Sequence, residues 1–328
     1  MIGRMDYPFE QLGFSPFGAA EQFNDLSLHR SGTVAMISML RLRQDKRAAR
    51  QAGNNMDMRL IAELKSAVDL LERESWAKSI LLASEHRLAF SIGVKIDMVL
   101  GSSFEQTLGF VQSAQELLLK LHGGSKPLIA ALNGMTFGGG LELAMGCDYR
   151  IAGERDNVRL GLPETSLGVL PAMGGTQNLP RLIGAHKARE FILTAKADIT
   201  PAQAKEDGLI DTVVPADALL QEALAFAKTG PAKKPSFDLS PVPTDRERIR
   251  KEIKEWLAAW TPARELQGRG APLAQALAEF VLEKTAKTRF CESLVYEQEA
   301  FACLVGTSDS QEGIHAMLEG RPPVFQRK

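Results

Sequence analysis

The chain has 328 residues, of which 45% are hydrophobic and 24% are charged, and its formal net charge is -1. This composition is typical of a globular protein with one large domain and a smaller one, and the balanced charge argues against a general nucleic-acid binder. Three scattered cysteines suggest neither a disulfide framework nor a zinc site and favour a reducing compartment. The sequence shows no signal-peptide pattern and no apolar run of the roughly 20 residues that span a membrane. We therefore expect a cytoplasmic protein that does not contact membranes.

The apolar patterns predict alternating strands and helices in the first 230 residues. Strands are predicted at 33–40, 79–84 and 127–134. Two helices are predicted between them, one capped by Asn54 or Asn55 and one running from Ser102 or Ser103 to Gly123. This alternation indicates an α/β domain with parallel strand pairing.

Composition divides the chain into four expected segments. These are an N-terminal extension (1–30), a core (31–228), a linker rich in Pro and Lys (229–245) and a helical C-terminal region (246–328). Ser308 to Gln311 resembles a capping box that opens a last helix. An apolar stripe precedes it, formed by Phe290, Leu294, Phe301 and Leu304. The sequence leaves open whether this stripe packs on its own domain or on a neighbouring subunit.

Three glycines, Gly138, Gly139 and Gly140, stand directly before a short helical run. A phosphate loop would need a following Lys-Ser/Thr pair, and a dinucleotide fingerprint would need GxGxxG spacing; both are missing. The glycines can instead let a substrate lie against backbone N–H groups, which suits a reaction that develops an oxyanion. Close packing of the helix on a strand is the structural alternative.

Two acids stand near glycine-rich turns. Glu142 follows Gly139 by three residues, so both lie on nearly the same helical face, and apolar neighbours predict that the carboxyl is partly buried. Glu164 follows a proline at the end of an apolar strand, a common position for a site residue. Two carboxyls that converge can serve as acid and base. The structural alternatives are an acid that complements the helix dipole for Glu142, and an N-cap or surface acid for Glu164.

The motifs together resemble a known family. GGG-x-E at 138–142, P-E-x-x-x-G at 163–168 and G-G-T-Q at 174–177 occur in the order found in the crotonase superfamily, and the chain most resembles its enoyl-CoA hydratases. Residues 89–97 are similar to the family's first oxyanion segment, and residues 296–325 to its terminal helices. The resemblance extends from about residue 33 to residue 325.

This resemblance implies a fold and an activity. The expected fold is an α/β spiral of ββα units with a helical C-terminal region that forms trimers or hexamers. The substrate would be a 2-enoyl-CoA, whose thioester oxygen would lie between the backbone N–H groups of Val94 and Gly139. Glu142 and Glu164 would bind the water that adds across the C2–C3 double bond. No metal and no cofactor beyond the coenzyme A of the substrate is expected.

The resemblance also implies substrate contacts. These are expected at Gly138, Gly140, Lys95, Ala172, Gly174, Lys46, Arg47 and Arg321. Some depart from the family pattern: Ala172 replaces a usual glycine, and Arg321 lacks the lysine that often precedes it. Solvation is the alternative for Lys95 and for the basic run at 41–50.

Other functions remain open at this point. An enoyl-CoA isomerase, or a hydratase or hydrolase of an unusual acyl-CoA, is the nearest alternative. Because the family's isomerases commonly keep only the acid at the Glu164 position, the presence of Glu142 favours hydration. A non-catalytic scaffold that binds acyl-CoA or RNA is a further alternative from another class.

Overall fold

The computed structural model describes residues 7–18, 23–40, 53–95, 98–234, 237–261, 266 and 270–326. The chain divides into two compact units. The first unit comprises Met1–Val94, Leu117–Leu160 and Asp198–Ser236. The second unit comprises Lys95–Glu116, Gly161–Ala197 and Phe237–Lys328.

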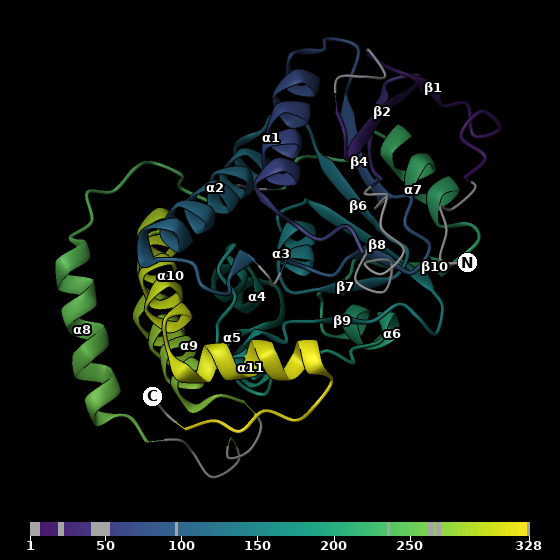
Figure 1. Cartoon of the computed structure of the whole chain (residues 1–328). Coiled ribbons are helices and arrows are strands. Elements are labelled where there is room, and N and C mark those ends of the chain that lie inside the picture. Colours follow the sequence, from purple (N-terminus) through teal and green to yellow (C-terminus); the bar gives the residue numbers. More distant parts are fainter. Residues whose placement is uncertain are drawn as a thin grey trace. The chain divides into compact units, whose positions relative to one another are not determined.

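The first unit is built on a seven-stranded sheet (Figure 1). Its order is β1 (Ser15–Pro16), β2 (Leu26–Ser31), β3 (Val34–Met39), β4 (Ser79–Ser84), β6 (Leu128–Leu132), β8 (Tyr149–Glu154) and β10 (Thr212–Pro215). The strands from β3 to β10 pair in parallel, whereas β1 and β2 form an antiparallel edge. The predicted α/β class and parallel pairing are therefore confirmed.

Helices cover this sheet through regularly spaced apolar residues. Helix α7 (Leu219–Lys228) packs against β4 and β6 (Figure 1), where Leu220 and Leu224 join the core. Short helix α6 (Pro201–Glu206) precedes β10. Burial of these apolar side chains is the main favourable contribution to the stability of the unit.

Helix α1 (Met58–Arg73) begins later than the sequence indicated. Its N-cap is Asp57, whose carboxylate accepts a hydrogen bond from the Leu60 N–H at 3.0 Å. The predicted caps Asn54 and Asn55 were wrong. Asn54 adopts a φ of +49° and donates to Ser84 Oγ and Phe90 O instead. A buried side-chain contact therefore overrides the local capping preference.

A small second sheet positions the glycine-rich turn. It consists of β5 (Ala89–Ser91), β7 (Met135–Phe137) and β9 (Leu160–Gly161). Helix α3 (Gly139–Met145) follows β7 directly and packs on β5 and β7. The turn at Gly138 is therefore fixed on both sides by regular structure.

Helix α2 (Phe104–Gly123) begins in the second unit and ends in the first. Ser103 Oγ accepts a hydrogen bond from the Gln106 N–H, and Gln106 Oε1 accepts one from the Ser103 N–H. This reciprocal pair makes Ser103 the cap, which settles the choice between Ser102 and Ser103.

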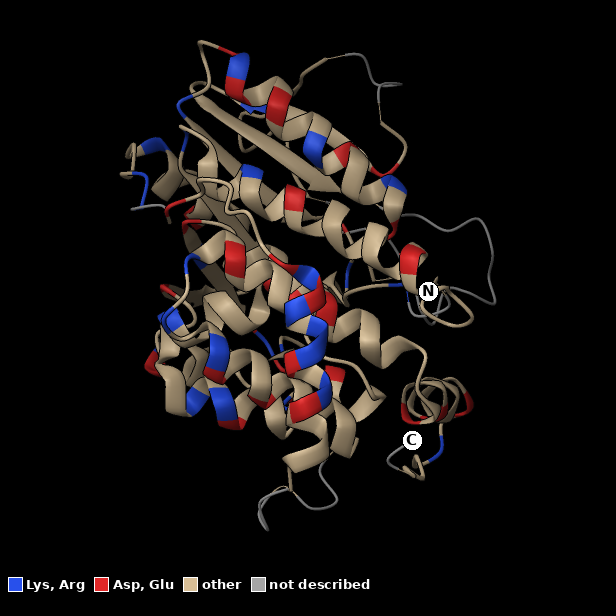
Figure 2. Cartoon of the chain, turned by 90° about the vertical axis from the view of Figure 1, so that its left-hand side faces the viewer, with Lys and Arg blue, Asp and Glu red and all other residues tan. Residues whose placement is uncertain are grey.

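The second unit is mainly helical. It contains the 3₁₀ turn η3 (Glu164–Leu167) and helices α4 (Gly175–Ile183), α5 (Ala185–Leu193), α8 (Arg246–Ala259), α9 (Pro272–Thr285), α10 (Phe290–Val305) and α11 (Ser308–Glu319). Acidic and basic residues crowd along α8, the helix nearest the viewer in Figure 2. In the described part of residues 229–245 no helix or strand forms.

The C-terminal helices settle one open question and correct one prediction. All four residues of the predicted apolar stripe are buried in α10, so this stripe packs within the chain itself. The N-cap of α11 is Thr307, whose side chain accepts a hydrogen bond from the Ser310 N–H. The predicted capping box at Ser308 was therefore wrong by one residue, because a threonine with the same capping chemistry precedes it.

Candidate active site

The three successive glycines have different structural roles. Gly138 adopts a φ of +53° and forms the N-cap of α3. A Cβ on Gly140 would lie 2.3 Å from Ser91 O, so this helix position admits no side chain. A Cβ on Gly139, however, would lie 3.5 Å from its nearest neighbours, at ordinary contact distance. The backbone conformation thus explains Gly138 and close packing explains Gly140, whereas neither requires a glycine at Gly139.

The segment around Gly93 lies against this turn. Gly93 adopts a φ of +87°, and a Cβ there would lie 2.9 Å from Phe137 O and 3.2 Å from Gly139 N. The Met56 N–H donates to Gly93 O at 2.8 Å and fixes the segment. The first unit therefore brings the segments of Val94 and Gly139 together.

The two predicted oxyanion donors are not engaged elsewhere. Within the described residues, neither the Val94 N–H nor the Gly139 N–H donates a hydrogen bond. Val94 Cγ2 lies 3.5 Å from the Cβ position of Gly139, so the two backbones are close neighbours. Two adjacent, unengaged N–H groups are the arrangement that can stabilise a developing oxyanion.

Glu142 lies one turn along α3 from these donors. Its side chain is 2% exposed, and the other residues of α3 are buried with it. The Glu142 N–H donates to Gly138 O at 3.0 Å, so the helix ties this acid to the glycine turn. The burial expected from its apolar neighbours is confirmed.

Glu164 belongs to the second unit, where it opens the turn η3. Its N-cap is Pro163, so the N-cap interpretation of Glu164 does not hold. Thr165 Oγ1 donates to Ile192 O at 2.8 Å and anchors the turn. The Glu164 side chain is half-buried, with its Oε2 atom enclosed by protein. The acid is therefore presented from a well-anchored turn.

Two other predicted contact residues of the second unit have backbone groups that are hydrogen-bonded to buried side chains. Gly174, with a φ of +87°, is the N-cap of α4, and its N–H donates to Glu297 Oε1 at 2.6 Å. Ala172 O accepts a hydrogen bond from Gln115 Nε2 at 3.0 Å. The Gly174 N–H is thus committed within the protein, whereas the substrate contacts predicted for both residues stay predictions.

The predicted cationic contacts differ in their surroundings. Arg321 donates to Glu312 through both terminal nitrogens, at 2.6 and 2.9 Å, and to Glu319 through Nε. These hydrogen bonds raise the pKa of Arg321 above its ordinary value, and the bonds with Glu312 contribute most. Lys95 is half-buried. Lys46 and Arg47 lie outside the described residues. The charge of Arg321 is thus already balanced by Glu312 and Glu319 of its own chain.

Sequence reasoning missed one buried acid, Glu297 of α10. It is 0% exposed and accepts hydrogen bonds from the region of Gly174 and Thr176. A signal was present, because Glu297 lies three residues after Leu294 and four before Phe301 on the predicted apolar stripe. An acid on a buried helical face needs partners, and the sequence did not show where they were.

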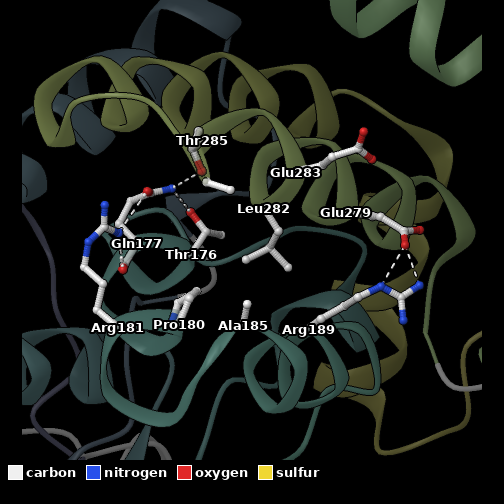
Figure 3. A pocket seen from close by; sticks show the side chains of 11 residues that line it. Thr176, Gln177, Pro180, Arg181, Ala185, Arg189, Glu279, Leu282, Glu283 and Thr285 are labelled. Atoms are coloured by element: carbon white, nitrogen blue, oxygen red, sulfur yellow. Dashed lines mark hydrogen bonds and ion pairs between the residues drawn. The ribbon is translucent and has the colours of Figure 1, made fainter.

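A pocket of about 460 Å³ opens in the second unit between α4, α5 and α9 (Figure 3). Figure 3 shows Thr176 and Gln177 on one wall, where Gln177 Nε2 donates to Thr285 Oγ1. On the opposite side, Arg189 forms an ion pair with Glu279. The predicted site residues are not among those that line this pocket. No group of acidic, histidine or cysteine side chains suited to a metal occurs in the described part of the chain.

Comparison with known proteins identifies the family. Residues 35–236 match the family described as Enoyl-CoA hydratase/isomerase. A putative enoyl-CoA hydratase/isomerase, YngF, from Bacillus subtilis is 34% identical over 84% of this chain and 91% of its own length. A 2,3-dehydroadipyl-CoA hydratase from Escherichia coli is 31% identical over 92% and 99%. The chain therefore belongs to the enoyl-CoA hydratase/isomerase family.

Solved structures support the same fold. An enoyl-CoA hydratase from Bacillus anthracis aligns with a TM-score of 0.58 at 27% identity, over 93% of this chain and all of the other. An enoyl-CoA hydratase/isomerase from Xanthobacter autotrophicus aligns with a TM-score of 0.65 at 20% identity, over 92% and 98%, and shows likeness of fold alone. The predicted crotonase-like fold is confirmed. No helix in the described ranges has the length and apolar character that crossing a membrane requires.

Proposed function

We propose that the protein is an enoyl-CoA hydratase that adds water across the C2–C3 double bond of a 2-enoyl-CoA. The observation that carries this proposal is the pair of adjacent, unengaged N–H groups of Val94 and Gly139, one helical turn from the buried Glu142. Family membership and the hydratase names of relatives support it.

In the proposed reaction, the thioester oxygen accepts hydrogen bonds from the Val94 and Gly139 N–H groups. Attack of a water oxygen on C3 forms the C–O bond and moves the double-bond electrons toward the thioester, which gives an enolate. The two N–H groups stabilise that charge, and loss of one such donor typically lowers the rate by about 10²–10³.

Glu142 and Glu164 complete the proposed proton transfers. In this proposal, one of the two carboxylates removes the proton of the attacking water as the C–O bond forms. A proton is then delivered to C2, which gives the saturated 3-hydroxyacyl thioester and restores both acids. Of the predicted contacts, Gly138, Gly140, Ala172 and Gly174 would adjoin the acyl end. Lys95, Lys46, Arg47 and Arg321 would face coenzyme A, and no further cofactor takes part.

Absorbance tests this proposal directly. Crotonyl-CoA and longer 2-enoyl-CoA substrates should lose the absorbance of the conjugated thioester when the protein is added. Replacement of Glu142 and Glu164 by glutamine should lower that rate by at least about 10²–10⁴. Turnover at the wild-type rate by the double variant would contradict the proposed site.

The alternatives give different outcomes in the same assay. An isomerase would convert 3-enoyl-CoA to the conjugated thioester, with a gain of absorbance and no loss with crotonyl-CoA. A scaffold would bind acyl-CoA in calorimetry without forming product at any chain length. The presence of the buried Glu142 favours hydration over isomerisation and over a scaffold without activity.

We also propose that the protein assembles as a homotrimer or hexamer. Large apolar side chains at the end of α11 and beyond it are exposed, namely Met317, Leu318 and Val324. Light scattering after size-exclusion chromatography should give about three or six times the chain mass of 35.8 kDa. A mass of one chain at micromolar concentration would contradict the proposed assembly.

A further inference from the structure

Glu297 is a buried carboxylate surrounded by hydrogen-bond donors of the second unit. Its Oε1 accepts from the Gly174 N–H at 2.6 Å and from Gln115 Nε2 at 3.1 Å. Its Oε2 accepts from the Thr176 N–H at 3.2 Å and from Thr176 Oγ1. The side chain is 0% exposed, so these contacts replace water completely.

The chemistry of these donors calls for a carboxylate. An ionised carboxylate is an acceptor only and can receive all four hydrogen bonds. A glutamine of the same shape would direct an NH₂ group at some of these donors, and buried donors without acceptors destabilise that arrangement. Glu297 is therefore selected for its charge rather than for its volume.

The same cluster holds the preceding residues. Gln115 Nε2 donates to Ala172 O at 3.0 Å, and Gln115 Oε1 accepts from Gln298 Nε2 at 2.6 Å. The segment from Ala172 to Thr176 is thus held at Ala172 O, at the Gly174 N–H and at Thr176. Its backbone cannot shift unless the carboxylate of Glu297 or the amide of Gln115 moves with it.

We propose that Glu297 is a positioning residue for hydration, which fixes the backbone of residues 172–176 where that segment adjoins the acyl group. The inference rests on the proposed function, because that function places the acyl thioester beside Ala172 and Gly174. Glu297 acts through the segment and does not touch the substrate. A displacement of about 1 Å in such a segment can lower the rate roughly a hundredfold.

Glu299 provides a matched control. It lies two residues further along α10, is also 0% exposed, and binds Arg246 and Arg250 of α8. Glu297→Gln and Glu299→Gln remove the same charge from the same helix at equal burial. Only the first puts an NH₂ group in place of an oxygen that accepts from Gly174 or Thr176.

The experiment compares kcat and KM of both variants with crotonyl-CoA, well below their unfolding temperatures. Glu297→Gln should lower kcat roughly 10- to 100-fold with KM within about twofold, because the coenzyme A contacts persist. Glu299→Gln should keep kcat within about twofold. Equal kcat values for the two variants would overturn the proposal.

Amide hydrogen exchange provides a readout independent of activity. Exchange at Gly174 or at Thr176 should accelerate in Glu297→Gln, according to which of them faces the new NH₂ group, and neither should accelerate in Glu299→Gln; unchanged rates at both in Glu297→Gln would overturn the positioning role. An inactive wild-type protein would instead contradict hydration, while exchange would still decide whether Glu297 holds the segment.

A less disruptive pair of variants at Thr176 can test the proposal if Glu297→Gln does not fold. Thr176→Val removes one hydroxyl donor at nearly constant volume, and Thr176→Ser keeps it. We expect kcat to fall several-fold in the valine variant and to stay near wild type in the serine variant. Equal kcat values for this pair would overturn the proposal.

Discussion

The two units of the molecule hold their candidate site residues by different means. In the first unit, backbone lies against backbone: Gly140 leaves no room for a side chain beside Ser91 O, and Gly93 is close to Phe137 O. In the second unit, a buried carboxylate accepts hydrogen bonds from two helices, as Glu297 does from Gln115 of α2 and from Gly174 and Thr176 at the start of α4.

This difference indicates which changes each unit tolerates. Close backbone contacts respond to added volume, because nothing nearby can move aside. Carboxylate clusters respond to loss of a charge or a donor, even when volume is kept. Gly93 and Gly140 should therefore be sensitive to added volume, and Glu297 and Glu299 to the loss of a charge or a donor.

The largest expected effect on stability is in the second unit. Replacing Arg246 and Arg250 by alanine leaves the buried Glu299 without both of its cations. The free energy of unfolding should fall by about 3–5 kcal/mol, as measured by chemical denaturation. Lys251→Ala on the same helix, where the side chain is 78% exposed, should change it by less than about 1 kcal/mol. If the double variant and Lys251→Ala lost similar amounts of unfolding free energy, the overall charge of α8, and not its contacts with Glu299, would determine stability.

A smaller effect tests the first unit. Gly140→Ala places a Cβ 2.3 Å from Ser91 O and should lower the free energy of unfolding by about 1–3 kcal/mol or more. Gly139→Ala meets its first neighbour at 3.5 Å and should stay within about 0.5 kcal/mol of wild type. It should still lower the hydration rate, since its methyl group lies against Val94, beside the proposed oxyanion donors. If Gly139→Ala lost as much unfolding free energy as Gly140→Ala, a glycine would also be required for packing at position 139.

The sequence predicted the first unit well for a physical reason. Parallel strands that are buried on both faces appear as short apolar runs, and glycines forced by sterics mark the turns between them. Strands 79–84 and 127–134 and the burial of Glu142 were therefore predictable. The individual roles of Gly138, Gly139 and Gly140 were not, because they depend on Ser91 and Val94, which are distant in sequence.

The second unit was less predictable. Helical periodicity indicated α10 and its apolar stripe, and the family motif pointed to Glu164. The partners of Glu297 lie 121 to 182 residues away in sequence, so no local pattern marks them. The helix starts at Asp57 and Thr307 were missed for another reason, because neighbouring residues had similar capping chemistry.

The helix caps provide a test in which the two units should behave alike. Asp57→Ala in the first unit and Thr307→Ala in the second each remove an acceptor for a backbone N–H. Each should lower the free energy of unfolding by about 1 kcal/mol, whereas Ser308→Ala should be nearly neutral. If Ser308→Ala lowered the free energy of unfolding as much as Thr307→Ala, Ser308 and not Thr307 would be the N-cap of α11.

The smallest expected effect is a difference in thiol reactivity between Cys147 of the first unit and Cys303 of the second. Complete burial raises the pKa of the Cys147 thiol to about 12, so at pH 8 almost no reactive thiolate forms in the first unit. Cys303 of the second unit is half-buried. Native protein treated with a disulfide reagent at pH 8 should therefore be labelled at Cys303 well before Cys147, as peptide mass spectrometry would show.

The same labelling shows whether the units open separately. Gly140→Ala should accelerate labelling of Cys147, because it loosens the packing of the first unit around α3. The Arg246→Ala and Arg250→Ala double variant should accelerate labelling of Cys303, which shares α10 with Glu299. If either variant accelerated both cysteines equally, the two units would unfold as one cooperative structure. The contrast between backbone packing and carboxylate clusters would then describe local contacts and not two separately stabilised regions.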